Sequence, residues 1–499
     1  MGAGIGGLAA AIQLVHQGYS VTVVEKNETA GGKIGVLHRD GFTFHTGASF
    51  IMHPEVFRDF FTSVGEDIEQ YIQMKPMGDT TTFHFANDKQ FTLASDQGLV
   101  RKRIAEQFPD DLKGYDRFMK IGKELNDLLY EGPKLARRNY HKFGGWDFLL
   151  NKDVIFNAHK LQLHRSWEQL VNSCFKSEEL RLIFSYQSTF VGLPPTESLG
   201  TYAFLPWSEI AQGMYQVKGG VYGIIQGFYK LARDRGVSFL FNSEVTALEY
   251  EDELVCAVQT TNGKLIADLF VSNIDGAYFY SHLMPAEKNV TFTEEKLHHM
   301  KHTNSYFTIN IGLKKPLPQL SHHTFFVAKN WQESFQLMFT PNSVPKFNAD
   351  NTCYYALQRS DLEPSLAPKG KAVLFLLFPV CGYDPEMDWD AYESTFKEFI
   401  YDLMEERDGI QVRKHIEIEE VYSPARWGRE YNLWQNVILS FAPTFFQANN
   451  FRMPNKSREF TNLYFVGSST VPGPGVPTRI SSGELVAERI AQDAQMSRG

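Results

Sequence analysis

Apolar positions near the start of the chain recur at helical spacing and then give way to a β-branched run. Leu8, Ala11, Ile12 and Val15 share one helix face, as the 3.6-residue period requires. Gly18 follows as a helix-ending glycine. The pattern therefore predicts a helix over residues 8–17 and a short buried strand over residues 21–24.

The far end of the chain shows the reverse order of elements. Residues 462–467 read as a strand that ends in glycine, 468–477 as a Pro- and Gly-rich loop, and 480–490 as a helix. The longest apolar run, 372–381, is far shorter than the ~18 residues of a membrane-spanning helix and contains Pro379. Its Val, Leu and Phe content favours a buried strand.

Strands and helices also alternate through the middle of the chain. Residues 219–240 read as a glycine turn, a helix and a strand that starts near Val237, and residues 265–273 read as another strand leading to Asp275. Residues 110–180 are mostly helical by their period. This alternation predicts an α/β fold class.

A glycine motif, G-x-G-x-x-G, lies immediately before the first predicted helix. Gly2 permits a tight turn, Gly4 lets a pyrophosphate approach the backbone, and Gly7 lets the helix lie close to the sheet. Glu25, at the end of the next strand, is placed to accept hydrogen bonds from ribose hydroxyls. Together these features predict a dinucleotide site rather than a chance glycine turn.

The strand expected before Gly2 is missing, because only Met1 stands there. Either the start was assigned too late or this form lacks its central strand, which would expose sheet edges. No signal peptide is expected, since Met1 adjoins the glycine motif directly.

A double glycine favours FAD over NAD. Gly31-Gly32-Lys33 and then residues 41–47 follow the acidic strand end, an order typical of FAD proteins similar to amine oxidases; an ordinary hairpin turn is the alternative. The 462–490 unit would direct helix N–H groups at the flavin N1/O2 edge. Arg479 either stabilises the negative charge that this edge gains on reduction or is a solvated or structural arginine.

Composition narrows the class of protein. The 499 residues, 43% hydrophobic and 21% charged, suggest two or three globular domains of ~150 residues. A net charge of −9 argues against a nucleic-acid partner held by a general positive field. Four cysteines without a C-x-x-C pair indicate a reducing cytoplasm. The 14% aromatic content fits a core or, alternatively, a long apolar substrate tunnel.

Several segments spread over the chain resemble the bacterial-type carotenoid (phytoene) desaturase family, and most closely its 4,4'-diapophytoene branch. They are residues 2–33, 41–47, 184–195, 218–223 and 462–482. The chain departs from the family at His45, where Asp is usual, and at Ser468, Val471 and Pro474 in the closing signature. These departures leave the cofactor expectation intact but bear on the substrate and the reaction.

The resemblance implies a discontinuous Rossmann-like FAD-binding domain (1–75, 215–290 and 425–499) and an α+β substrate domain (76–214 and 291–424) with helices facing a membrane. It implies FAD-dependent dehydrogenation of a linear carotenoid precursor, phytoene or 4,4'-diapophytoene, by hydride transfer to flavin N5. No catalytic base is identified, although His45 is a candidate. The expected cofactor-binding residues are Gly2, Gly4, Gly7, Glu25, Lys26, Gly32, Lys33, Gly47, Val245, Gly467, Ser468, Gly475 and Val476.

Four other functions remain open. Terminal-methyl oxidation to carotenoid aldehydes is the first, and a more distant amine or porphyrinogen oxidase is the second. An inactive paralogue and a nicotinamide-only reductase are the others. Adjacent histidine pairs, such as His298-His299, complete no metal-ligand pattern, so no metal is expected.

A basic and aromatic stretch suggests a membrane surface as a partner, with a charged helix over an aromatic core as the alternative. We expect peripheral attachment to the inner face of the cell membrane, an apolar polyene substrate, and quinone or oxygen as electron acceptor. The stretch contains Lys134, Arg137, Arg138, Tyr140, Lys142, Phe143 and Trp146.

Overall fold

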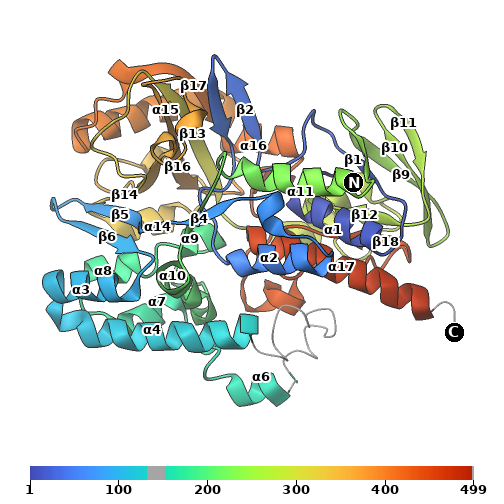
Figure 1. The fold of residues 1–499 in the computed structure, drawn as a ribbon, viewed down its shortest axis with the longest axis horizontal. Coiled ribbons are helices and arrows are strands. Elements are labelled where there is room, and N and C mark those ends of the chain that lie inside the picture. The colour runs from blue at the N-terminus through green and yellow to red at the C-terminus, as the bar shows by residue number, and fades with distance from the viewer. Residues whose placement is uncertain (132–149, 151, 497–499) are drawn as a thin grey trace.

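The computed structural model describes residues 1–131, 150 and 152–496. The helices and strands of these residues form two neighbouring groups, seen on the right and left of Figure 1. Parallel strands and helices on the right surround both ends of the described chain, while a larger sheet and a helical layer lie on the left. The expected α/β fold class is confirmed.

Two parallel strand pairs form the centre of the right-hand group. β1 (Thr22–Val24) pairs with β8 (Ser238–Leu240), and β12 (Phe270–Ser272) pairs with β18 (Leu463–Phe465). Residues 1 and 2 lie between the pairs: the Met1 nitrogen donates to the Val271 carbonyl at 2.8 Å and Gly2 N–H to the Val24 carbonyl at 2.7 Å. The central position expected to be empty is therefore bridged by the backbone of residues 1 and 2.

Helices cover these strands. The predicted first helix is α1 (Ile5–His16), and the predicted last helix is α17 (Val476–Met496), longer than expected. The two helices lie against each other, so closely that a β-carbon on Gly483 would be 2.8 Å from that of Ala9. α11 (Tyr222–Asp234) and α2 (Pro54–Ser63) complete the layer (Figure 1).

The strand expected over residues 265–273 is divided in two. β11 (Gly263–Ile266) pairs with β10 (Leu254–Thr260) and β9 (Val245–Glu251) in an antiparallel sheet, whereas β12 joins the parallel strands. The prediction of one strand is wrong because the chain changes sheets between residues 266 and 270. Apolar content alone could not show this change of partner.

A seven-stranded sheet dominates the left-hand group, in the order β17-β13-β16-β15-β14-β5-β6. The predicted strand at 372–381 is β16, buried throughout. Leu374, Leu376 and Phe378 of β16 face the core under α15 (Trp389–Asp402), while Phe375 and Leu377 face the helical layer. Burial on both faces explains the continuous apolar run. The other strands are β5 (Asp79–Phe85), β6 (Gln90–Ala94), β13 (Ser305–Leu313), β14 (His323–Val327), β15 (Tyr354–Gln358) and β17 (Ile416–Tyr422).

The helical layer confirms the helical prediction for the described part of residues 110–180. It contains α3 (Gln97–Gln107), α4 (Leu112–Asn126), α6 (Lys152–Asn157), α7 (Trp167–Cys174), α8 (Glu178–Ile183), α9 (Ser188–Val191) and α10 (Phe204–Ala211). The basic and aromatic stretch at residues 134–146 lies outside the described residues. Within the part of the chain that is described, we find no helix with the length and apolarity needed to cross a bilayer.

Shorter elements connect the two groups. β2 (Val36–Arg39) and β3 (Phe42–His45) form a hairpin, and β4 (Met74–Pro76) pairs with β7 (Tyr215–Val217). The remaining helices are α12 (Gly276–Tyr278), α13 (Glu294–His299), α14 (Trp331–Leu337) and α16 (Pro424–Tyr431).

Candidate cofactor and substrate site

The glycine-rich turn before α1 makes room for one side chain, that of Asn273. A β-carbon on Gly4 would lie 2.7 Å from Asn273 Nδ2, and one on Gly467 would lie 2.6 Å from Asn273 Oδ1. Gly2 has a φ of 92°, which only glycine adopts without strain. Gly4 caps α1 without a side-chain hydrogen bond, so the first N–H groups of this helix can bind an anion.

Glu25 is held in place by backbone donors. Its Oε2 accepts from Ala3 N–H at 2.6 Å and its Oε1 from Asn27 N–H at 2.9 Å. Burial raises the pKa of this carboxyl, and the two hydrogen bonds oppose that rise. Each carboxylate oxygen can accept more than one hydrogen bond. Glu25 therefore remains able to accept from ribose hydroxyls.

Three buried cationic side chains lie near Ser468, on the loop before α17: they are Lys33, Arg452 and Arg479. Lys33 Nζ donates to the Ile438 carbonyl at 2.6 Å and to Ser468 Oγ at 3.2 Å. Burial, reinforced by the Arg479 guanidinium, lowers the pKa of Lys33 to about 7. Arg479 in turn has its pKa lowered to about 10 by burial and by the charge of Arg452. Three cations at one place favour an anionic ligand.

One cavity of about 110 Å³ brings together seven of the predicted cofactor residues and Arg479. Gly475 and Val476 line a second cavity instead. Gly7, Gly47 and Gly467 contact the turn segments that form the first cavity, and Val245 lies buried in β9. The seven residues are Gly2, Gly4, Glu25, Lys26, Gly32, Lys33 and Ser468.

These residues fit FAD. The uncapped start of α1 and the Lys33 ammonium suit a pyrophosphate, and the Glu25 carboxylate suits a ribose diol. The β-carbons that Gly4 and Gly467 lack would otherwise overlap Asn273 and close the turn. In this fit Glu25 would bind the ribose, the start of α1 would bind the phosphates, and Lys33 with Arg479 would lie between the phosphates and the flavin.

The second cavity is apolar and larger, about 260 Å³. Its walls come from the segment before α2, from the turn and helix around α9, and from the start of α17. Phe190 contacts Phe50 edge to face, with ring centroids 5.8 Å apart. Arg452 lines this cavity and donates from Nη2 to the Ser468 carbonyl at 2.7 Å, so it connects the two cavities.

His45 lies apart from both cavities. It is buried, packs against Gly220 and lines a small separate cavity of about 30 Å³ together with Arg359. Burial and the Arg359 charge lower its pKa to about 3, so its imidazole is neutral at physiological pH. A catalytic role for His45 stays a prediction, and its position gives a reacting group no direct access from the apolar cavity.

Several residues of the two cavities escaped the sequence analysis. Asn273, Tyr431 and Arg452 lie on segments without a motif, and each reaches its cavity through long-range packing. Asp275 was recognised only as the end of a strand, yet it lines the cofactor cavity and accepts from Ser469 Oγ at 3.1 Å. A polar residue at the end of a parallel strand was the signal available for Asn273 and Asp275.

Comparisons with known proteins cover the whole chain. Residues 5–491 match the family model described as flavin containing amine oxidoreductase. The zeta-carotene-forming phytoene desaturase of Myxococcus xanthus is 30% identical over 98% of this chain and 93% of its own length. The 4,4'-diapolycopene oxygenase of Methylomonas sp is 29% identical over 99% and 98% of the two chains. The 4,4'-diapophytoene desaturase of Staphylococcus haemolyticus is 28% identical over the same shares.

Solved structures support the same fold. An oxidoreductase from Methanosarcina mazei has a TM-score of 0.62 at 16% identity and covers 98% of both chains. Cyclohexylamine oxidase from Brevibacterium oxydans has a TM-score of 0.59 at 18% identity over 99% of this chain and 98% of its own. The family model confirms FAD as the cofactor, and the full-length similarity to phytoene and diapophytoene desaturases confirms the resemblance to that family. The chain belongs to the flavin containing amine oxidoreductase family.

Proposed function

We propose that this protein is an FAD-dependent desaturase of a linear carotenoid precursor of the phytoene or 4,4'-diapophytoene type. The observation that carries the proposal is the apolar cavity, which adjoins the cofactor cavity at Arg452 and Ser468. Full-length similarity to a phytoene desaturase and a diapophytoene desaturase supports this substrate class.

The protein's part in this reaction is mainly positional. When bound, oxidised FAD accepts a hydrogen together with its electron pair. The aromatic walls around Phe50 and Phe190 orient an apolar chain and exclude water. A hydrocarbon offers no heteroatom to protonate, so alignment of one C–C bond with the flavin replaces strong acid–base contacts. Oxygen or a membrane quinone would reoxidise the flavin.

Terminal-methyl oxidation is the second candidate. The 4,4'-diapolycopene oxygenase is almost as similar to this chain as the phytoene desaturase. Val471 and Pro474, which depart from the usual desaturase signature, lie in the loop before α17, and Pro474 lines the apolar cavity. These two departures from the desaturase signature support terminal-methyl oxidation as the second candidate reaction at the same site.

Pigment analysis separates the two reactions. We would express the protein in one host that accumulates 4,4'-diapophytoene or phytoene and in another that accumulates a desaturated C30 polyene. Loss of two hydrogens per step, with a red-shifted spectrum, supports desaturation. Oxygen added to the coloured polyene alone supports terminal oxidation. No change in either host, with FAD bound, contradicts both.

We also propose peripheral attachment to the inner face of the cell membrane. Ile155 and Phe156 of α6 and the nearby Phe446 are 56%, 75% and 62% exposed. An apolar groove between α6 and Phe445 lies beside them, and Pro443 of the same loop lines the apolar cavity. A bilayer contact here would let an apolar substrate enter without crossing water.

A further inference from the structure

One phenol in the wall of the apolar cavity is left free to bind a ligand. It belongs to Tyr202, which lies on the short 3₁₀ turn Gly200–Ala203 before α10 and lines the cavity. Its hydroxyl makes no hydrogen bond to a described residue. Because the side chain is only partly buried, this oxygen keeps surface that a ligand in the cavity can reach.

Other hydroxyls of the same wall are already used by the fold. Thr201 donates to the Leu161 carbonyl, and Thr478 donates to the Gly475 carbonyl at 2.7 Å. A polar group that is removed from water without a partner costs free energy. A pure hydrocarbon in the cavity would impose that cost on the Tyr202 hydroxyl, whereas a ligand with an oxygen atom at this point would not.

The Arg452 guanidinium favours this phenol as a hydrogen-bond donor. Both side chains line the apolar cavity, and they lie close enough for each to shift the pKa of the other. Burial raises the pKa of Tyr202 to about 12 against the opposing charge of Arg452, so the hydroxyl keeps its proton at physiological pH. The positive charge beside the hydroxyl attracts a ligand atom that carries negative partial charge.

The guanidinium itself has no paired donors left for a carboxylate. Nη1 donates to the Phe441 carbonyl at 3.2 Å and to the Gln447 carbonyl at 3.5 Å, and Nη2 donates to the Ser468 carbonyl at 2.7 Å. A carboxylate in an apolar cavity needs two well-placed donors from one arginine. An uncharged carbonyl oxygen needs one hydrogen bond, which Tyr202 can supply. Since Ser468 also lines the cofactor cavity, the carbonyl would lie toward the cofactor.

We propose that Tyr202 binds the carbonyl oxygen at the end of a linear polyene, with the charge of Arg452 favouring that oxygen. This inference rests on the proposed function, because it requires that the apolar cavity holds a polyene. It extends the substrate class from hydrocarbons to polyenes that already carry an aldehyde at one end. The hydrogen bond fixes the oxygenated end of such a molecule toward the cofactor, whereas a hydrocarbon has no group that would fix its position along the cavity.

Binding of crocetin dialdehyde, a linear polyene with an aldehyde at each end, tests the proposal. FAD-loaded protein is mixed with phosphatidylcholine vesicles that contain the probe, the vesicles are removed by flotation, and the probe kept by the protein is measured by its visible absorbance. Tyr202→Phe keeps the ring and removes only the donor. We expect about five- to tenfold weaker binding of the dialdehyde, as for loss of one hydrogen bond, and undiminished binding of the hydrocarbon 4,4'-diapolycopene. An equal loss for both polyenes would overturn the proposal.

The carbonyl stretching band of the bound probe gives a readout that a packing defect would not change. The hydrogen bond from Tyr202 should lower this frequency in the wild-type protein, and Tyr202→Phe should return it toward that of the free aldehyde. Tyr115→Phe is the matched control, because the Tyr115 hydroxyl donates to the Gln97 carbonyl at 3.1 Å and its side chain does not line the apolar cavity. This control should keep the wild-type frequency and affinity. The same frequency in wild type and Tyr202→Phe would overturn the proposal, whatever their affinities.

The remaining outcomes separate this inference from the proposed function. If FAD-loaded wild-type protein binds neither the dialdehyde nor 4,4'-diapolycopene, the cavity does not hold a polyene and the proposed function itself fails. If wild type and Tyr202→Phe bind both polyenes equally well, only this inference fails. Tighter binding of crocetin, the corresponding diacid, than of the dialdehyde would overturn the assignment of an uncharged end.

Discussion

Two glycines shape the cofactor site because they lack a β-carbon. Gly4 and Gly467 approach opposite atoms of the Asn273 amide, so a β-carbon at either position would enter its van der Waals radius. The side chain of Asn273 thus connects the turn before α1 with the end of β18. The shape of the site here depends on β-carbons that are absent at two distant points of the sequence, Gly4 and Gly467.

Gly4→Ala should therefore abolish tight FAD binding while leaving the rest of the protein folded. The new methyl group would lie 2.7 Å from Asn273 Nδ2 and fill the approach to the helix start. Flavin content of the purified protein, compared with circular dichroism, measures the effect. Gly65→Ala is a suitable control for altered glycine content, because nothing lies within 4 Å of its added methyl, although its φ of 78° will lower stability slightly. A yellow, fully loaded Gly4→Ala protein would contradict this reading.

We predict that Lys33 makes FAD binding dependent on pH. Its pKa of about 7 in the free protein means that it must gain a proton to meet the phosphate charge at higher pH. FAD affinity should weaken as pH rises above 7, by up to about tenfold per pH unit. Fluorescence titration with FAD measures this affinity. A range of about pH 6 to 9 covers about one unit below and two units above the pKa of Lys33.

Lys33→Met supplies the comparison. It should bind FAD weakly at every pH, with the slope above pH 7 removed, since no proton is taken up. At a pH below about 7, burying the charged Lys33 lowers the free energy of unfolding of the FAD-free protein. This loss of stability disappears as the pH rises from about 7, the pKa of Lys33 in the folded protein, toward its higher pKa in the unfolded chain. An identical slope in Lys33→Met would assign the pH dependence to another group.

At the scale of elements, periodicity predicted several of the helices and strands, because local spacing records which face is buried. α1, α17 and β16 follow directly from such patterns. Pairing partners did not follow, since they depend on distant segments: the run at 265–273 divides between two sheets. The glycine turn and Glu25 were predictable from a motif, whereas Asn273 and Arg452 reach their cavities through tertiary packing.

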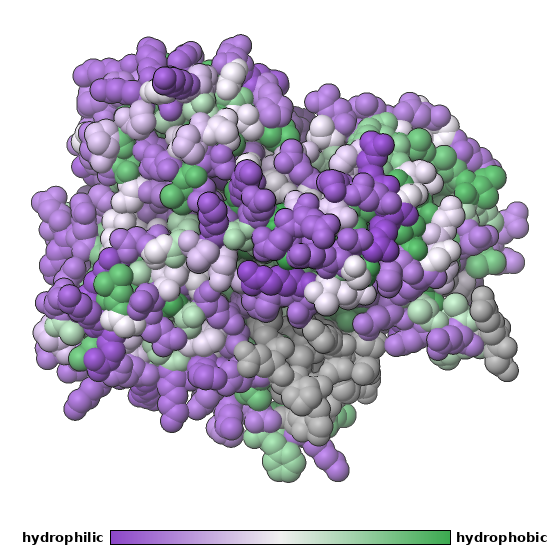
Figure 2. Space-filling view, viewed as in Figure 1, coloured by the Kyte–Doolittle hydropathy of each residue, from purple (hydrophilic) through white to green (hydrophobic). Residues whose placement is uncertain are grey.

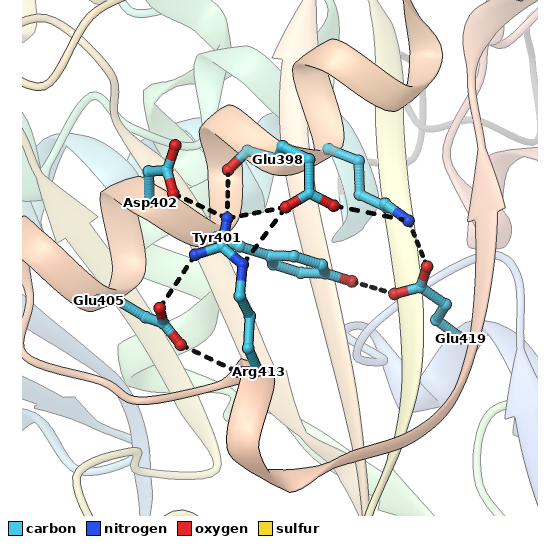
Figure 3. A network of polar contacts seen from close by, with 7 residues as sticks. Glu398, Tyr401, Asp402, Glu405, Arg413 and Glu419 are labelled. Atoms are coloured by element: carbon cyan, nitrogen blue, oxygen red, sulfur yellow. Dashed lines mark hydrogen bonds and ion pairs between the residues drawn. The ribbon is translucent and has the colours of Figure 1, made fainter.

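A polar network joins α15 to the strand at the edge of the large sheet (Figure 3). Arg413 donates to Glu398, Asp402 and Glu405 at 2.7–2.9 Å, and Tyr401 OH donates to Glu419 of β17 at 2.6 Å. In Figure 3 the guanidinium lies among the three carboxylates. Glu398 and Asp402 belong to α15, and Glu405 belongs to the π-helical turn Leu403–Arg407 that follows it. The network fixes the return of the chain from α15 into β17.

Arg413→Ala should destabilise this region by about 1–2 kcal/mol, because the three carboxylates would lose their shared partner and repel each other. Hydrogen exchange at α15 and β17, followed by mass spectrometry, should accelerate. Arg429→Ala removes a far more exposed pair with Asp390 and should leave exchange there unchanged. Equal protection in Arg413→Ala and wild type would show that packing alone holds α15.

At the scale of the whole molecule, the two cavities meet where segments from both groups of elements approach each other. The cofactor cavity takes residues from 1–33, 273–275, 430–433 and 468–479, and the apolar cavity adds residues from the helical layer. No local sequence pattern shows that these distant segments meet at one place. The resemblance to a known family predicted that distant segments share one cofactor domain, whereas composition indicated only an apolar tunnel as one of two alternatives.

The proposed membrane contact belongs to this scale as well. Figure 2 shows a mostly hydrophilic face with hydrophobic residues in several places, among them the lower edge where Figure 1 draws α6 and the upper right where it draws β9, β10 and β11. Replacing both Phe156 and Phe446 by Ser should reduce cosedimentation with anionic vesicles several-fold, because buried aromatic area supplies much of interfacial binding. Ile266→Ser, on β11, removes an apolar residue that is 79% exposed elsewhere and should bind as wild type does. Unchanged binding of the double variant would exclude this surface.

The packing of α17 on α1 has a consequence for how the protein is made. Residues near position 5 and near position 479 line the same cofactor cavity, so a ribosome must deliver both before FAD has its complete set of contacts. The intervening chain, including the large sheet, is therefore synthesised without the cofactor. FAD can therefore make its complete set of contacts only after the last helix has been synthesised and has packed on the first.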